Sequence, residues 1–166
     1  MLEESIDAVL AGQGGLCNTL NLFICEFLKT LGYNAYPILA SVGVDRTDDG
    51  DHAIVGVRDV MKNGDLYLIE AGFGSPTFLP INMDFSEESE TYHQSYDIYK
   101  YVKRGDKYVR LHKTGSRETN PNAKEEWVDV YYFSIEPSTT EQIQDGVDRI
   151  VYQDQTTLFH TFIRVA

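Results

Sequence analysis

The order of segments along the chain predicts an α+β fold, in which N-terminal helices pack on an antiparallel, partly closed β-barrel. Helical spacing of apolar residues is confined to the beginning of the chain, and many short strand-like runs with turn signals follow it. A chain of 166 residues also suits a single core. We therefore expect a helical segment at residues 1–34 and a β-barrel domain at residues 35–166, which together form one compact unit.

Two helices are expected before the first strand. Residues 3–11 carry Ile6, Val9 and Leu10 on one side and end at Gly12, which is typical of a short amphipathic helix. The second helix is longer, and its apolar residues recur at helical spacing, so we expect it to bury the face made by Leu20, Phe23, Ile24, Phe27, Leu28 and Leu31. Gly32 then ends it. Cys25, in the middle of this helix, is interpreted as a core residue because free cysteines are usually buried.

Strand-like segments make up most of the remaining chain. They are short apolar or alternating runs, separated by turn signals such as Asn63-Gly64. The expected strands are residues 36–44, 52–57, 66–70, 96–103, 108–113, 127–135 and 158–165. Between Pro76 and Ser95 the sequence shows no regular pattern. Pro137-Ser138-Thr139 is expected to open a short helix that runs to about residue 150.

The composition disfavours several classes of partner. The formal net charge is −12 at pH 7, which argues against nucleic acid and anionic membranes because both require a basic face. No apolar run approaches the length that spans a bilayer, and the N-terminus lacks the features of a signal peptide. The two cysteines fit a reducing compartment, so a cytoplasmic protein is expected. The acidic loop after Asp45 lacks the glutamate of a calcium loop, and no metal site is predicted.

Cys17 is the residue on which a functional interpretation depends. It follows Gly14-Gly15 and lies in the first turn of the longer helix. The N–H groups of a first turn carry partial positive charge, so a thiol placed there ionises more easily, and the thiolate is the reactive form. Cys17 also lies one turn before Leu20 on the apolar face, as a core residue would. Position alone leaves both interpretations open.

A nucleophilic thiol requires a histidine as base and a carboxylate that orients the histidine. His52 begins a strand directly after a polar loop, where functional sites are commonly built. Glu70 is a lone acid at the end of an apolar strand, where a charge is costly unless it is paired. Cys17, His52 and Glu70 are therefore the candidate catalytic residues, and the other histidines are interpreted as structural: His93, His112 and His160.

The register of the hairpin between the two strands decides whether this histidine and this acid can meet. A tight turn on Asn63-Gly64 would place Glu70 opposite Val57, with His52 on the other face of the sheet. A wider loop would place Val57 opposite Asp65, and His52 directly across from Glu70. We predict the wider loop, because it pairs an otherwise isolated acid with a histidine on a shared face.

The order and spacing of several motifs resemble the arylamine N-acetyltransferase family. These motifs are Gly14-Gly15-Leu16-Cys17 with Asn21, then His52, then Ile69-Glu70-Ala71-Gly72-Phe73-Gly74, and finally Tyr132-Phe133-Ser134-Ile135-Glu136-Pro137. The resemblance implies a cysteine-proteinase-like fold and a Cys-His-Asp triad, with acetyl-CoA as donor and an arylamine or hydrazine as acceptor. In that scheme Cys17 is the acetylated nucleophile of a ping-pong reaction, His52 is the base and Glu70 is the orienting acid.

The same resemblance points to binding residues. Gly74 and Ser75 match the family's glycine-containing loop near the coenzyme pyrophosphate, and Thr156 falls near a family coenzyme contact. Phe73 is the candidate aromatic wall against the acceptor, with a core role as the alternative.

The chain also departs from the family. Glu70 stands where the family has Asp, Gln13 where it has Arg, and Thr19 where it has Glu or Gln. Most of the family's N-terminal helical region and its whole C-terminal third domain have no counterpart here. Two other functions therefore stay open: a thiol hydrolase or amide-forming enzyme with another acyl donor, and a binding homologue with a weakened site.

Overall fold

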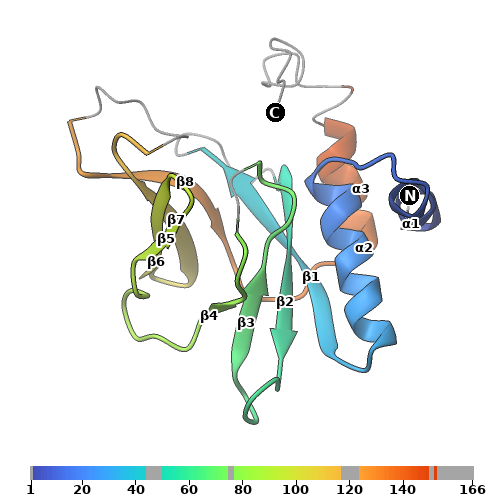
Figure 1. Ribbon diagram of the computed structural model, residues 1–166, viewed down its shortest axis with the longest axis horizontal. Coiled ribbons are helices and arrows are strands. Elements are labelled where there is room, and N and C mark those ends of the chain that lie inside the picture. Colours follow the sequence, from blue (N-terminus) through green and yellow to red (C-terminus); the bar gives the residue numbers. More distant parts are fainter. Residues whose placement is uncertain (1, 44–49, 75–76, 117–123, 150–151, 153–166) are drawn as a thin grey trace.

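The computed structural model describes residues 2–43, 50–74, 77–116, 124–149 and 152. Over these residues the chain forms three helices and one eight-stranded antiparallel sheet. The helices lie together on one side of the molecule, and the sheet curls away from them into a half-barrel (Figure 1). The predicted α+β class and the partly closed barrel are confirmed. The division of the chain at residue 34 stays a prediction.

The two N-terminal helices end close to the predicted positions. α1 (Leu2–Leu10) is followed by Gly12, whose φ of 72° is the left-handed conformation that favours glycine. α2 (Cys17–Thr30) begins at the thiol residue, and the chain leaves it through Gly32, with a φ of 91°.

A capping box starts the third helix, α3 (Thr140–Asp148), as the sequence predicts. The backbone N–H of Gln142 donates to Oγ1 of Thr139 at 3.2 Å, and the backbone N–H of Thr139 donates to Oε1 of Gln142 at 2.8 Å. The helix then packs beside α2 against β1 and β2.

The strands form two antiparallel groups that join through β1 and β8. Their spatial order is β4-β3-β2-β1-β8-β7-β6-β5. The bounds are β1 (Asn34–Val42), β2 (His52–Arg58), β3 (Leu66–Ile69), β4 (Ile81–Asn82), β5 (Tyr92–Gln94), β6 (Asp97–Arg104), β7 (Lys107–Lys113) and β8 (Trp127–Phe133). The short strands β4 and β5 lie in the stretch that showed no sequence pattern. The strand predicted at residues 158–165 lies outside the described residues.

The main core fills the concave side of the sheet and is rich in aromatic rings. Its buried members include Tyr36, Ile38, Ile54, Leu68, Tyr99, Tyr101, Tyr108, Tyr131 and Phe133. The other face of the sheet is covered by helices where β1 and β2 run, so six of the seven residues of β2 are buried. Because β2 is packed on both of its faces, the side chains that it carries are held in fixed positions.

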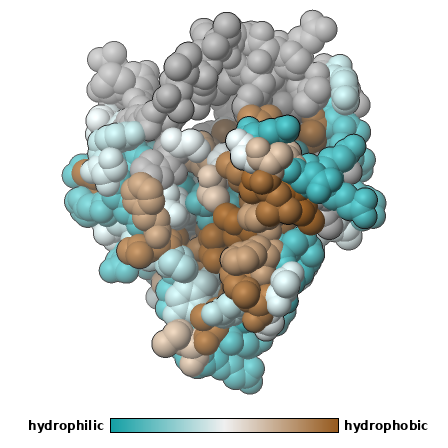
Figure 2. Space-filling model, turned by 45° about the vertical axis from the view of Figure 1, so that its right-hand side comes forward, coloured by the Kyte–Doolittle hydropathy of each residue, from teal (hydrophilic) through white to brown (hydrophobic). Residues whose placement is uncertain are grey.

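The buried face of α2 differs from the predicted one. Phe27 and Leu31 belong to the predicted stripe but are 53% and 58% exposed. The fully buried residues of α2 are Asn21, Leu22 and Cys25, because Leu22 and Cys25 pack against β1 and β2. The core role predicted for Cys25 is confirmed. Apolar surface is consequently exposed on the side of the molecule turned forward in Figure 2.

The register between β2 and β3 differs from both alternatives considered for the sequence. Val57 pairs with Tyr67, and this places the pairing two residues away from the predicted contact of Val57 with Asp65. The prediction that His52 lies directly across from Glu70 is therefore wrong, and so is the tight turn. A shift of two residues keeps every side chain on its face of the sheet. Glu70 thus stays on the face of His52 and lies diagonal to it.

Asp65 explains the shift. Its carboxylate accepts the backbone N–H groups of Val60, Met61 and Lys62 at 2.8, 2.9 and 3.0 Å. These bonds hold Asp65 inside the connection, so the pairing of β2 with β3 begins at Arg58 and Leu66 rather than at Val57 and Asp65. None of the described helices is long and apolar enough to cross a membrane.

Candidate active site

Two elements that are distant in the sequence meet at the Cys17 thiol. Cys17 is the first residue of α2 and is partly buried. Gly72, in the loop after β3, lies directly against its backbone, so a Cβ atom at residue 72 would overlap the Cα atom of Cys17. Only glycine allows the loop to approach the helix this closely. The position of the thiol therefore depends on the loop as well as on the helix.

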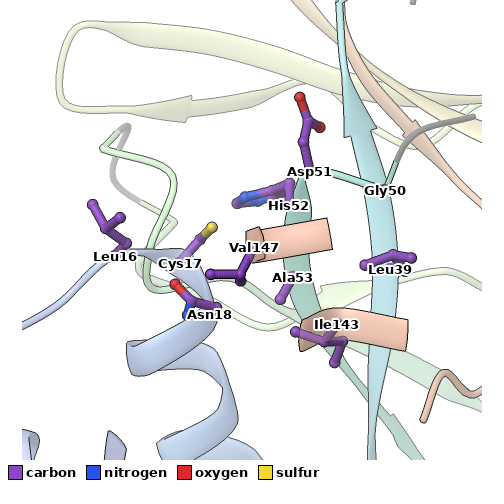
Figure 3. Close-up of a pocket in the computed structure, with 10 residues that line it drawn as sticks. All are labelled: Leu16, Cys17, Asn18, Leu39, Gly50, Asp51, His52, Ala53, Ile143 and Val147. Carbon is purple, nitrogen blue, oxygen red and sulfur yellow. The ribbon is translucent and has the colours of Figure 1, made fainter. Parts of the chain in front are cut away.

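His52, the first residue of β2, lies between the thiol and Glu70. Its Nε2 atom is 2.6 Å from Oε2 of Glu70, and both side chains are buried. The same ring is hydrogen-bonded to the Cys17 thiol, and Figure 3 shows the sulfur pointing toward the ring. The structure thus brings together the three residues predicted as catalytic, in the order Cys17, His52, Glu70.

Asn21 ties the helix to the strands around this group. It lies one turn after Cys17 on α2 and is buried. Its Nδ2 donates to Oε1 of Glu70 at 3.0 Å and to the carbonyl of Ala53 at 2.7 Å, and its Oδ1 accepts the N–H of Ala71 at 2.9 Å. The sequence motif contained Asn21 without giving it a role. The available signal for such a role was a polar residue one turn after Cys17 on the same face of the helix.

The two oxygens of Glu70 have separate partners. Oε1 accepts the N–H of Gly72 at 3.0 Å in addition to the Asn21 amide, and Oε2 contacts His52. One oxygen is therefore used for positioning while the other holds the imidazole. A buried carboxylate with all these partners is well compensated.

The pKa values of the three groups are shifted toward their charged forms. Burial raises the pKa of the Cys17 thiol, but the hydrogen bond and charge of His52 outweigh burial and lower it overall. Burial lowers the pKa of His52, yet Glu70 and Cys17 raise it to about 10. Burial also opposes ionisation of Glu70, and His52 nevertheless keeps the carboxyl pKa below its usual value. The arrangement favours a thiolate and an imidazolium backed by a carboxylate.

A small pocket with apolar walls borders the thiol (Figure 3). It lies between the starts of α2 and β2 and the helix α3, from which Ile143 and Val147 line it. Gly146 of α3 packs so closely on the backbone of Gly50 that a Cβ atom would not fit. The lining residues are Leu16, Cys17, Asn18, Leu39, Gly50, Asp51, His52, Ala53, Ile143 and Val147.

The remaining predicted residues are only partly placed. The ring of Phe73 lies 5.3 Å from the ring of His52 and 5.2 Å from that of Tyr131, between centroids. Gly74 is exposed and has a φ of 86°. Ser75 and Thr156 lie outside the described residues. Within the described part of the chain, no group of three or more His, Cys, Asp or Glu side chains could hold a metal ion.

A buried arginine beside Phe73 was not singled out from the sequence. Arg110 lies on the same inner face of the barrel as Tyr108 and His112, and all three are buried. The alternation of these residues along one strand was the available signal. His112 was interpreted as structural, and its burial with a pKa lowered to about 3 agrees with a neutral packing residue.

A family model described as N-acetyltransferase matches residues 3–164. The chain belongs to the N-acetyltransferase family. Among solved structures, this N-acetyltransferase chain matches many arylamine N-acetyltransferases, which confirms the resemblance noted in the sequence. A search of curated proteins gave no match.

Three of these structures illustrate the extent of the similarity. The arylamine N-acetyltransferase from Salmonella typhimurium has a TM-score of 0.76 at 18% identity, over 96% of this chain and 55% of its own. The Mycobacterium marinum arylamine N-acetyltransferase, in complex with CoA, has a TM-score of 0.69 at 23% identity, and the match covers 89% of this chain and 52% of that one. The Bacillus cereus arylamine N-acetyltransferase is described as having a unique Cys-His-Glu catalytic triad. It has a TM-score of 0.68 at 24% identity, and the match covers 93% of this chain and 58% of that one. This chain spans about half the length of each.

Proposed function

We propose that this chain transfers an acetyl group from acetyl-CoA to an arylamine or hydrazine by a ping-pong mechanism. Cys17 is the nucleophile, His52 is the general base and Glu70 orients the imidazole. The observation that carries the proposal is the buried, hydrogen-bonded series from the thiol through the imidazole to the carboxylate. The Bacillus cereus relative, described with a Cys-His-Glu triad, supports glutamate in the orienting role.

The first half-reaction acetylates the enzyme. The Cys17 thiolate attacks the thioester carbonyl carbon of acetyl-CoA, the bond from that carbon to the coenzyme sulfur breaks, and the departing thiolate takes the proton held on His52. α2 begins at Cys17, and its N-cap Leu16 supplies no side-chain acceptor. The first N–H groups and the positive end of this helix are therefore the proposed stabilisers of the negative charge that develops on the carbonyl oxygen.

The second half-reaction transfers the acetyl group to the acceptor. The amine nitrogen attacks the acetyl carbon, His52 accepts a proton from the nitrogen, and the Cys17 thiolate departs. Glu70 keeps the imidazole oriented in both steps through its 2.6 Å contact. The apolar walls of the pocket disfavour water as a competing acceptor.

The binding residues complete the proposal. The CoA complex of the Mycobacterium marinum relative supports a coenzyme A thioester as the donor. Gly74, Ser75 and Thr156 are the proposed coenzyme contacts, and Phe73 is the proposed wall of the acceptor site. Phe73 suits this role because its ring is partly buried and lies against His52.

Mass spectrometry of the intact protein after incubation with acetyl-CoA tests the proposal. We expect one acetyl adduct on Cys17 that disappears when an arylamine is added. Cys17→Ala should abolish the adduct. Cys25→Ala is the matched control, because burial raises the pKa of Cys25 to about 11 and its thiol stays protonated. Absence of any adduct would contradict acetyl transfer.

Alkylation with iodoacetamide as a function of pH separates the alternatives. The lowered pKa of Cys17 predicts that labelling persists below the ordinary thiol pKa of about 8.5. In His52→Ala, burial remains and raises the thiol pKa, so the rate at neutral pH should fall by more than about tenfold. Low-pH alkylation without an acetyl adduct would favour an enzyme with another acyl donor. Labelling that rises only near the ordinary pKa would favour a binding homologue.

A further inference from the structure

The pocket that borders the Cys17 thiol lies on the helix side of the imidazole. On its barrel side, His52 packs against Phe73 and Tyr131, at 5.3 Å between ring centroids in both cases. Among the described residues, neither of these two rings lines the pocket, whose walls come from the starts of α2 and β2, from β1 and from α3. The pocket is therefore distinct from the proposed acceptor wall at Phe73.

The walls on the far side of the thiol are aliphatic. Leu39 of β1 and Ile143 and Val147 of α3 supply them, and Ile143 is fully buried. Figure 3 shows Val147 projecting from α3 into the same space as the sulfur of Cys17. Such walls favour an alkyl group over a polar one, because they offer no hydrogen bonds in exchange for lost hydration.

Close contacts fix the position of α3 beside this pocket. Just before the helix, the N–H of Ser138 donates to the carbonyl of Pro37 at 2.8 Å, and its Oγ accepts the N–H of Leu39 at 2.9 Å. Within the helix, a Cβ atom on Gly146 would lie 2.0 Å from the carbonyl oxygen of Gly50. Glycine is unfavourable inside a helix, so the close approach accounts for its presence here. The residue that follows this glycine is thereby held at the pocket wall.

Asp51 makes the pocket unsuitable for a negatively charged group. It lines the pocket directly before His52, and its Oδ1 accepts the backbone N–H of Val42 at 2.7 Å. No lysine or arginine of the described chain lines the pocket. A second carboxylate placed there would lose its hydration and lie near a like charge.

We propose that the alkyl chain of the acyl group on Cys17 lies in this pocket, and that Ile143 and Val147 set the longest chain that the thiol accepts. This inference rests on the proposed function, because it names the donors of the same nucleophile: short, uncharged acyl-CoA thioesters, of which acetyl-CoA is the smallest. The bonds made and broken are those of acetylation, since only the alkyl group on the carbonyl carbon differs. Each methylene group that the walls bury favours the acyl-enzyme.

A series of donors tests the inference without any variant. The rate of Cys17 acylation is measured by mass spectrometry of the full chain with acetyl-, butyryl-, octanoyl- and malonyl-CoA. Butyryl and malonyl groups are similar in size, but only the malonyl group carries a charge. We expect butyryl-CoA to react at least as fast as acetyl-CoA, and malonyl-CoA to react about 100-fold more slowly than butyryl-CoA. Octanoyl-CoA should react at least about tenfold more slowly than butyryl-CoA, because α3 closes the pocket.

Two substitutions of Val147 should move the chain-length limit in opposite directions. Val147→Ala should raise the rate with octanoyl-CoA about tenfold relative to acetyl-CoA, and Val147→Phe should lower the rate with butyryl-CoA about tenfold while acetylation continues. Val60→Phe is the matched control, because Val60 is 38% exposed in the connection between β2 and β3. It should leave all rates unchanged. An equal loss for every donor in Val147→Phe would overturn the inference, as would equal rates for butyryl- and malonyl-CoA in the unmodified chain.

Donors without coenzyme A separate this inference from the proposed function. The 4-nitrophenyl esters of acetate, butyrate and octanoate acylate a reactive thiol directly. If these esters acylate Cys17 with the expected chain-length limit while the CoA thioesters do not react, the acyl pocket stands and acetyl-CoA is removed as the donor. Acetylation by acetyl-CoA without any chain-length limit would leave the proposed function standing and remove the pocket. Failure of both kinds of donor would overturn both.

Discussion

The two oxygens of Glu70 have separate partners, and this division suits the orienting role proposed for it. Oε1 is held by the Asn21 amide and the N–H of Gly72, and Oε2 faces His52 at 2.6 Å. An aspartate at this position would be one methylene shorter and could not reach all three partners without movement of the backbone. Glutamate therefore suits the proposed orienting role, since the surrounding loop and helix place its three partners at the reach of its side chain.

Replacement of Glu70 tests this division of roles. Glu70→Gln retains an oxygen for Asn21 and Gly72 but removes the negative charge that raises the pKa of His52. The pKa of His52 should then fall, and the rate of Cys17 acetylation should fall about 100-fold or more, with little change in Tm. Glu70→Asp, measured alongside, should retain more activity because it keeps the charge. A normal acetylation rate in Glu70→Gln, followed by rapid-quench mass spectrometry, would contradict the role.

The junction of α2 with the loop after β3 depends on the missing side chain of Gly72. Gly72→Ala would force Cys17 and the loop apart, because the new Cβ would overlap the Cα atom of Cys17. Small displacements of a nucleophile cost about 100-fold in rate. We expect kcat/KM to fall by this order while circular dichroism shows the same secondary structure.

Gly64→Ala provides the comparison for this variant. Gly64 has a φ of 87° and nothing within 4 Å of the added Cβ, in a connection far from the thiol in sequence and topology. It should lower stability by about 1 kcal/mol through backbone strain and leave kcat/KM unchanged. If both variants lost activity to the same degree, the loss would reflect general destabilisation rather than displacement of Cys17.

Sequence periodicity predicted the elements of the site better than the contacts between them. The positions of Cys17 on a helix start and of His52 at a strand start follow from local signals, and the structure contains both. The strand register did not follow, because Asp65 folds back onto three N–H groups of its own loop. The buried face of α2 and the environment of Arg110 depend on residues distant in sequence, which no local pattern encodes.

The net charge of the whole chain opposes the donor that the site is proposed to use. The chain carries a formal charge of −12, and acetyl-CoA is itself an anion through its phosphates. Binding must therefore depend on local groups such as backbone N–H donors, acting against a repulsive field. Salt screens that field beyond about 8 Å at physiological ionic strength, whereas contacts within the site are screened much less.

The second-order rate constant for Cys17 acetylation by acetyl-CoA should consequently rise a few-fold as ionic strength increases from about 0.01 M to about 0.15 M. Most enzymes that attract an anionic substrate through a basic surface show the reverse dependence, because salt weakens their attraction. A truncated, uncharged acetyl thioester is the matched control, and its rate should not change with salt because it feels no net field. Stopped-flow measurement of both donors checks the prediction. A rate for acetyl-CoA that falls with salt would mean that a local cluster of cations governs the encounter, in spite of the net charge of −12.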